Sequence, residues 1–293
     1  EFRRVLFRSV PSKMDPVFFP RLTKTSKSFK AQALKEIAAM GGKKGIVGIN
    51  EDLKECYEIT AKVLDLKNSP ACKQDNLCAF DNYNTQIILE KGDEPRMKGS
   101  LKDANTWSDA LILQYYEEPD AKKSAFGHNI TLTDWTKIAK IKDVYGDVLF
   151  AAPTVAVNVA HPLLVYMYDE LSDKDRKLSF LCGHDSNIAS VTAALEVEPY
   201  NLPNSIEKKT PIGCKLVFEK FEGKDGQMYC DINLTYQSTE QLRNIAMLSL
   251  NNPPQIFPIS LKGLQKNADG LYLLNDLKAR FMKAIRAYDK IED

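Results

Sequence analysis

The sequence predicts an α/β protein that carries a helical insertion, and three observations lead to this prediction. From Ser28 to Tyr145 the chain alternates between helical patterns and polar loops. A further helical pattern then leads to a short apolar run, Leu178–Cys182, which is typical of a buried strand and stops at Gly183 before a new helix. Towards the C-terminus, two segments alternate in polarity as antiparallel strands do, and an amphipathic helix closes the chain.

Composition excludes several classes of partner. The chain is 44% hydrophobic and 27% charged, which is ordinary for a globular protein. Lys and Arg total 40 against 39 Asp and Glu, so no bulk field attracts nucleic acid or an anionic membrane. No apolar run is long enough to span a bilayer. We therefore expect neither a nucleic-acid nor a membrane partner.

The first nine residues do not look like natural protein. Glu1–Ser9 has neither a helical nor a strand period, and one reading frame of a widely used short-read sequencing adapter encodes the same residues. We interpret this stretch as a sequencing scar and leave it out of the fold prediction. The natural sequence is then expected to begin near Val10, in mid-protein, so a missing signal peptide carries no information about secretion.

The first half of the chain is expected to hold four main helices. The first runs from Ser28, a possible N-cap, to Met40, where Gly41 and Gly42 stop it. Asn50 is expected to cap the second helix. A third passes through Trp107, and a fourth begins at about Thr133.

Two of the six cysteines lie in one short segment of this half. Cys72 and Cys78 enclose a stretch of proline and polar residues, which we expect to form a loop. A disulfide between the two cysteines would stabilise this loop. A Cys-x5-Cys pair without a neighbouring His is a poor zinc site. The pair therefore favours an oxidising compartment. The remaining cysteines are expected to be buried free thiols: Cys56, Cys182, Cys214 and Cys230.

The second half supplies the sheet. Pro153 is suited to the first position of a helix. Thr210–Phe221 and Met228–Tyr236 read as two antiparallel strands joined by a turn. Gln255–Leu261 reads as a short edge strand, and Leu274–Tyr288 as the closing helix.

His184 and Asp185 are the sharpest candidates for chemistry. They follow a predicted strand and precede a helix, and open α/β sheets bind ligands at such strand ends. The exposed N–H groups of the following helix suit an anion. A cationic His could bind that anion, and a protonated Asp could donate to a leaving oxygen. The alternative is a helix-capping Asp beside a structural His, and the residues alone leave both interpretations open.

The other polar candidates are weaker. His128 and His161 are scattered along the chain and fit surface or packing roles, so no metal site is expected. Glu94, in a Gly-Asp-Glu-Pro loop, reads by itself as a solvated acid. Arg243 reads as part of a structural ion pair rather than as an anion ligand.

Several motifs, in order along the chain, resemble those of the histidine acid phosphatases, and most closely the bacterial glucose-1-phosphatase group, with the phytases nearby. The motifs are Met14-Asp-Pro-x-Phe18, Ser69-Pro-Ala-Cys-Lys73, Gly183-His-Asp-Ser-Asn-Ile-Ala-Ser190, Thr210-Pro-Ile-Gly213 and Glu240-Gln-Leu-Arg-Asn244. The resemblance implies a histidine-phosphatase-like mixed sheet flanked by helices, with its first strand missing. It divides the chain into the scar (1–9), a partial α/β phosphatase domain (10–27 and 146–293) and a helical insertion domain (28–145).

The resemblance also implies an activity and a set of site residues. The family hydrolyses phosphomonoesters through a phosphohistidine, without a cofactor. His184 would bind the phosphate, Asp185 would act as the general acid, and Glu94 would contact the sugar. Cys72 and Cys78 would match a family disulfide. The expected substrate is a small phosphorylated molecule, either a sugar phosphate such as glucose 1-phosphate or an inositol phosphate. The expected location is the periplasm, the signal peptide being lost with the missing N-terminus.

One departure from the family is serious. The chain contains no Arg-His-x-x-Arg-x-Pro motif, and none of its three histidines follows an arginine. The nucleophile is expected to lie upstream of Val10, so the chain as given should have little or no activity. The alternatives are a phytase and a non-catalytic phosphate-binding relative.

Overall fold

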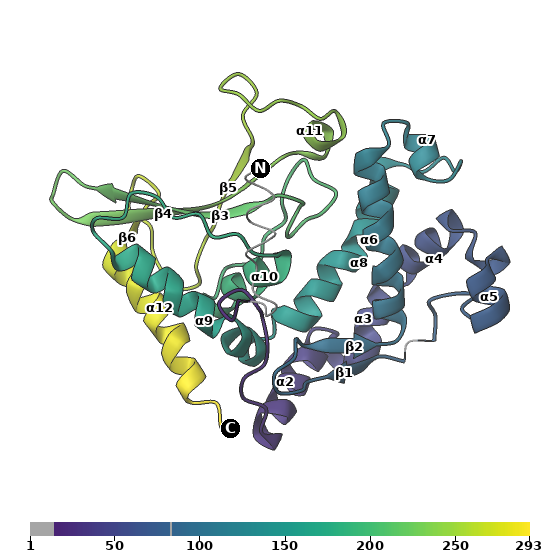
Figure 1. Ribbon diagram of the computed structural model, residues 1–293, viewed down its shortest axis with the longest axis horizontal. Coiled ribbons are helices and arrows are strands. Elements are labelled where there is room, and N and C mark those ends of the chain that lie inside the picture. Colours follow the sequence, from purple (N-terminus) through teal and green to yellow (C-terminus); the bar gives the residue numbers. More distant parts are fainter. Residues whose placement is uncertain (1–14, 83) are drawn as a thin grey trace.

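The computed structural model describes residues 15–82 and 84–293, so the predicted scar at Glu1–Ser9 lies outside the described residues. The α/β class predicted from the sequence is confirmed. Figure 1 shows a sheet with helices packed on it in one half of the molecule and a group of helices in the other half. Two long consecutive helices, α8 (Leu132–Phe150) and α9 (Pro153–Ser172), connect the two halves.

The helical half also contains a short two-stranded ribbon. Strand β1 (Gln86–Ile88) pairs antiparallel with β2 (Arg96–Lys98), a feature that the sequence did not predict. The helices of this half are α2 (Lys27–Ala39), α3 (Ile46–Asp52), α4 (Lys54–Val63), α5 (Pro70–Asp75), α6 (Ser100–Glu117), α7 (Ala121–Ser124) and α8 (Leu132–Phe150), with 3-10 turns at Gly42–Lys44 and Leu66–Asn68.

Two predicted N-caps of this half are wrong. Helix α2 is capped by Ser26, whose hydroxyl accepts a hydrogen bond from the backbone N–H of Phe29, and not by Ser28. Asn50 lies inside α3 with no exposed surface, and its side chain accepts a hydrogen bond from the Tyr57 hydroxyl. In each case the predicted cap is a polar residue that lies within one turn of the true start of a helix.

Helix α8 begins slightly earlier than predicted. Thr131, and not Thr133, is its cap: the Thr131 hydroxyl accepts from the Asp134 N–H, and the Asp134 carboxylate accepts from the Thr131 N–H. This reciprocal pair is a capping box. A threonine cap with an acidic residue three positions later satisfies two backbone N–H donors. This is why Thr131, and not its neighbour Thr133, caps the helix.

The sheet half agrees with most of its predicted elements. Strands β3 and β4 form the predicted hairpin, β5 and β6 both pair with β4, and the pairings given by the described residues are all antiparallel. Pro153 begins α9, as expected. The elements are α9 (Pro153–Ser172), α10 (Asp185–Ala194), β3 (Lys215–Glu222), β4 (Met228–Tyr236), α11 (Thr239–Arg243), β5 (Gln255–Pro258), β6 (Tyr272–Leu273) and α12 (Leu274–Asp289).

The predicted buried strand at Leu178–Cys182 is wrong. The segment is irregular, and Leu178 and Phe180 expose 83% and 73% of their surface. A strand needs a neighbour to receive its backbone hydrogen bonds, and within residues 15–82 and 84–293 no segment pairs with this one. The Cys182 thiol, predicted to be buried, is exposed for the same reason.

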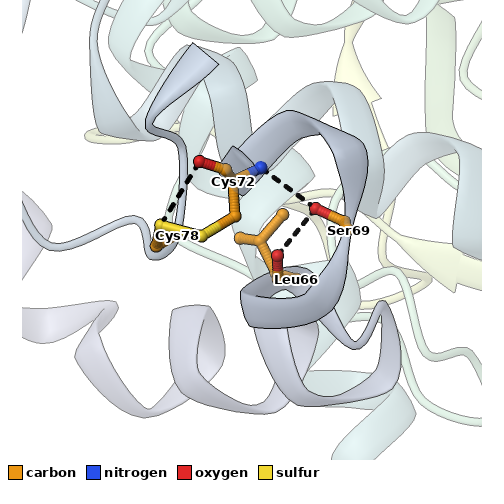
Figure 2. Close-up of a disulfide and its surroundings, with 4 residues drawn as sticks. All are labelled: Leu66, Ser69, Cys72 and Cys78. Atoms are coloured by element: carbon orange, nitrogen blue, oxygen red, sulfur yellow. Dashed lines mark hydrogen bonds between the residues drawn. A yellow bond between two sulfur atoms is a disulfide. The ribbon is translucent and has the colours of Figure 1, made fainter. Parts of the chain in front are cut away.

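The Cys72–Cys78 disulfide is confirmed, but the segment that carries it is not the predicted loop. Figure 2 shows Cys72 on the short helix α5, bonded to Cys78 just beyond the helix end. The Ser69 hydroxyl caps this helix by accepting from the Cys72 N–H, and Pro70 occupies its first position. Serine followed by proline is a helix-start signal, which outweighed the polar, proline-containing composition.

The apolar core has three parts, and the two connecting helices each belong to two of them. The N-terminal half of α8 shares one cluster with α4 and α6, through Trp135 and Ile138, and its C-terminal half belongs to a second cluster that also contains residues of α2 and α3. Helix α9 joins that second cluster through Val155 and joins the sheet cluster through Leu164. Among the described residues no single helix is long and apolar enough to cross a membrane; α8 and α9, bent by 82°, meet that test only as a pair.

The disulfide gives a stability prediction. Replacing both cysteines by serine, Cys72→Ser with Cys78→Ser, should lower the free energy of unfolding by about 2 kcal/mol, because the unfolded chain regains the entropy of a short closed loop. Urea denaturation of both proteins measures the difference. A reducing agent should destabilise the natural sequence by a similar amount and leave the double variant unchanged; an equal response of both proteins would contradict the prediction.

Candidate active site

The polar turn predicted at His184 and Asp185 forms at the N-terminus of α10. His184 is the N-cap residue, with extended backbone angles (φ −118°, ψ 170°), and Asp185 is the first helical residue. Both side chains are exposed. One oxygen of Asp185, Oδ1, accepts a hydrogen bond from the backbone N–H of Ser186 at 2.8 Å. The turn therefore presents an imidazole and a carboxylate side by side at a helix N-terminus.

Asn187 holds this turn in place, a role that the sequence analysis missed. Its side chain is buried, its Oδ1 accepts from the His184 N–H at 2.9 Å, and its Nδ2 donates to the Phe18 carbonyl at 3.0 Å. Gly183 has no room for a side chain, because a Cβ there would lie 2.6 Å from Asn187 Oδ1. The signal was present in the sequence, since an amide three residues after an N-cap can reach back to it.

Asp185 faces a lysine from the helical half. Lys142, on α8, places its Nζ 3.8 Å from Asp185 Oδ2 and 2.5 Å from Glu207 Oε1. Glu207 has no exposed surface, and its other oxygen accepts a hydrogen bond from the Tyr116 hydroxyl at 2.9 Å. Neither Lys142 nor Glu207 was singled out from the sequence.

Glu94 lies in the loop between β1 and β2, half-buried rather than fully solvated. Burial raises the pKa of Glu94, the charge of His184 lowers it, and the charge of Asp185 raises it. These opposing effects require the three side chains to be close enough to interact. The structure therefore brings together the three residues named from the sequence as site candidates.

Asp185 also lies on the wall of a cavity of about 730 Å³. Its size is within the usual range for small-molecule sites, about 300 to 1,000 Å³. Its walls combine acidic, basic and hydroxyl groups from both halves of the molecule, including Lys142, Tyr145, Asp185, Ser186, Lys209 and Thr210. A small polar ligand reaching Asp185 would therefore also contact α8 and the segment before β3.

Asp143, on the wall of the same cavity, is a buried acid. Burial raises the pKa of Asp143 to about 7, opposed by the hydrogen bond that its carboxylate accepts from the Lys208 N–H at 2.8 Å. The charge of Glu207 raises this pKa further. This pKa places the change in charge of Asp143 near neutral pH, and the sequence analysis did not single this residue out.

His161 and Arg243, two other candidates from the sequence, make contacts that fit structural roles. His161 stacks on Tyr288 with ring centres 3.9 Å apart, and burial lowers its pKa. Arg243 donates to the backbone carbonyls of Tyr115 and Pro119, so carbonyls replace the expected ion-pair partner. Among the residues that the structure describes, no group of three or more His, Cys, Asp or Glu side chains is arranged to hold a metal.

Comparison with known proteins finds relatives over nearly the whole chain. It is 39% identical over 279 residues to the glucose-1-phosphatase of Providencia rettgeri, covering 93% of this chain and 65% of the relative. It is 37% identical to the glucose-1-phosphatase of Salmonella typhimurium, covering 88% of this chain and 61% of the relative. The chain thus spans less than two thirds of the length of these curated relatives. No family model matches it.

Solved structures show the same fold. The apo form of the Hafnia alvei phytase superposes with a TM-score of 0.81 at 22% identity, covering 96% of this chain and 71% of the phytase. The Citrobacter braakii phytase gives a TM-score of 0.77 at 21% identity, with 92% and 69% covered. The fold expected from the motif resemblance is therefore confirmed.

Asp143 gives a prediction for stability against pH. The folded-state pKa lies above the unfolded value, so this carboxyl stabilises the fold at low pH, and the contribution is lost as the pH rises through about 7. Asp143→Asn cannot ionise. Its free energy of unfolding, relative to the natural sequence, should therefore increase by about 2 kcal/mol between pH 5 and pH 8.

Urea denaturation at the two pH values measures this change. Asp75→Asn, at an exposed position on α5, serves as the matched control and should show a much smaller change with pH. A difference between Asp143→Asn and the natural sequence that stays constant from pH 5 to pH 8 would contradict the prediction.

Proposed function

Because the chain is a homologue of the bacterial glucose-1-phosphatases and has the histidine acid phosphatase fold, we propose that it is part of a phosphatase that hydrolyses sugar phosphates. The proposed substrate is glucose 1-phosphate. The observation that carries the proposal is that Glu94 interacts electrostatically with both His184 and Asp185, and that Asp185 lies on the wall of the cavity. No cofactor is needed for this reaction.

Each of the three residues has a proposed task that fits its surroundings. His184, at the N-terminus of α10, binds the phosphate with the help of the helix end. Asp185 protonates the leaving oxygen of the sugar. Glu94 accepts hydrogen bonds from sugar hydroxyls; the half-buried position of its carboxylate beside the turn supports this role.

The nucleophile is not assigned to a residue of this chain. The family's attacking histidine follows an arginine, and His128, His161 and His184 do not. The proposal therefore gives the chain the leaving-group side of the reaction: phosphate binding, proton donation and sugar contact. The attacking histidine, which would form the phosphohistidine, is not among the residues to which we assign a task.

A phytase is the second candidate, because the phytase of Escherichia coli is 24% identical over 277 residues and the solved relatives above are phytases. Inositol phosphates carry many negative charges, so their recognition needs free cations. Two cations near Glu94 are already paired: Arg96 with Glu90 and Asp93, and Lys91 with Asp293. Lys98, exposed on β2, is a third cation close to Glu94 in the sequence, so the charges of this loop leave both kinds of substrate open. A non-catalytic phosphate-binding relative remains the third candidate.

Two further parts of the proposal concern organisation and location. We propose that the chain divides into a helical insertion, 28–145, and an α/β phosphatase domain, 10–27 and 146–293, of which residues 10–14 lie outside the described residues. We also place the protein in the bacterial periplasm. The Cys72–Cys78 disulfide supports an oxidising compartment, and the relatives are bacterial.

The phosphate-binding role of His184 can be tested with the three histidines as mutual controls. Inorganic phosphate, titrated at pH 5 and followed by NMR of the imidazole groups, should shift the resonances of His184 and leave those of His128 and His161 in place. His184→Asn should abolish the saturable response. Equal shifts at all three histidines, or no shift at His184, would count against the proposed site.

Because no nucleophile is assigned to this chain, we can predict the result of an activity assay. The 293-residue chain, incubated with glucose 1-phosphate at acid pH, should release little or no phosphate above the blank, because none of its histidines follows an arginine as the family's nucleophile does. Robust turnover by this chain would contradict the prediction, because one of its own residues would then have to act as the nucleophile.

A further inference from the structure

We propose that Lys142 and Glu207 form a positioning pair that orients Asp185 and sets the pH at which it takes up a proton. The inference deepens the proposed function and rests on the role of Asp185 as proton donor. Lys142 stands between two carboxylates, 2.5 Å from Glu207 Oε1 and 3.8 Å from Asp185 Oδ2. All three groups come from different parts of the chain.

The pair is fixed by its surroundings. Glu207 is fully buried, and its Oε2 accepts from the Tyr116 hydroxyl at 2.9 Å and from the Ile212 N–H at 3.4 Å. The Lys142 side chain is only 15% exposed. A buried carboxylate is costly unless it is paired and hydrogen-bonded, so Glu207 holds the lysine at one position beneath Asp185.

Asp185 uses its two oxygens differently. Oδ1 accepts a hydrogen bond from the Ser186 N–H at 2.8 Å, whereas Oδ2 faces Lys142 at 3.8 Å, too far for a hydrogen bond. The lysine thus attracts the carboxylate without occupying Oδ2. This oxygen stays available to carry the proton that the leaving group needs.

The charge of Glu207 limits how strongly Lys142 acts on Asp185. A lone ammonium group at this distance would favour the ionised carboxylate and oppose its protonation. Glu207 lies closer to the same ammonium and offsets part of its field. Burial lowers the pKa of Lys142, but Glu207 and then Asp185 raise it, and the net direction is upward, so the lysine is cationic.

Other charged groups act on the same residues. Glu94 interacts electrostatically with both His184 and Asp185, and Asp109 of α6 interacts with Lys142. Asp143, which is buried on the same helix as Lys142, interacts with both Lys142 and Glu207. We therefore expect the two members of the pair to have opposite effects on Asp185: removing the cation should make protonation easier, and removing the buried anion should make it harder.

The test follows the protonation of Asp185 by 13C NMR of its carboxyl carbon in the intact chain, with the signal assigned through Asp185→Asn. In Lys142→Met the midpoint should rise by about 1 pH unit, because an opposite charge within reach has been removed. In Glu207→Gln it should fall by about 0.5 pH unit, because Lys142 then acts on Asp185 alone. Midpoints that move in the same direction, or do not move, would overturn the proposal.

Two controls make the result specific. Lys209 lines the same cavity and lies 3.9 Å from Asp147, so Lys209→Met should leave the Asp185 midpoint unchanged. If Lys142→Met does not fold, the double variant Lys142→Met with Glu207→Gln leaves no uncompensated buried charge. Its midpoint should lie above that of Glu207→Gln alone; a midpoint equal to it would contradict a role for Lys142.

This readout is separate from the proposed function. It needs neither turnover nor a bound phosphate. Opposite midpoint shifts would support the positioning pair even if phosphate failed to perturb His184, which would count against the phosphatase proposal alone. Unchanged midpoints with normal phosphate binding would reject the pair and keep the proposed function.

Discussion

The buried carboxylate of Glu207 is the interaction on which the arrangement of this molecule depends. It receives Lys142 from α8, the hydroxyl of Tyr116 from α6, and a backbone N–H from Ile212, just before β3. A charge without solvent must be compensated on every side. Meeting this requirement holds α6 and α8 of the helical half against the segment that leads into β3. The candidate site lies at this junction, so its geometry follows from the same constraint.

The elements that the sequence predicted correctly were those specified by neighbouring residues. Alternating polarity was enough to predict the β3–β4 hairpin, and a proline at the first helical position was enough for α9. The capping box of Ser238 and Gln241 at the start of α11 likewise depends only on residues three positions apart. The failures were of another kind. Leu178–Cys182 has the composition of a strand, but forming one requires a partner from elsewhere in the chain.

The same distinction separates the site residues that could be predicted from those that could not. His184 and Asp185 form a contiguous motif, and Glu94 could be named only through a family resemblance. Lys142 and Glu207 are 65 positions apart, and nothing local in either segment indicates that they meet. The importance of Asn187 likewise depends on the carbonyl of Phe18, 169 residues away. Long-range contacts of this sort appear only once the chain is folded.

The uncovered segment at Leu178–Cys182 has a consequence for how the chain behaves at high concentration. It combines exposed apolar side chains with backbone groups that no described residue satisfies. Such a segment is a template for edge-to-edge association between molecules. It leads directly into Gly183 and His184. Any strand that paired with this segment, from this chain or from another, would therefore end beside the candidate site.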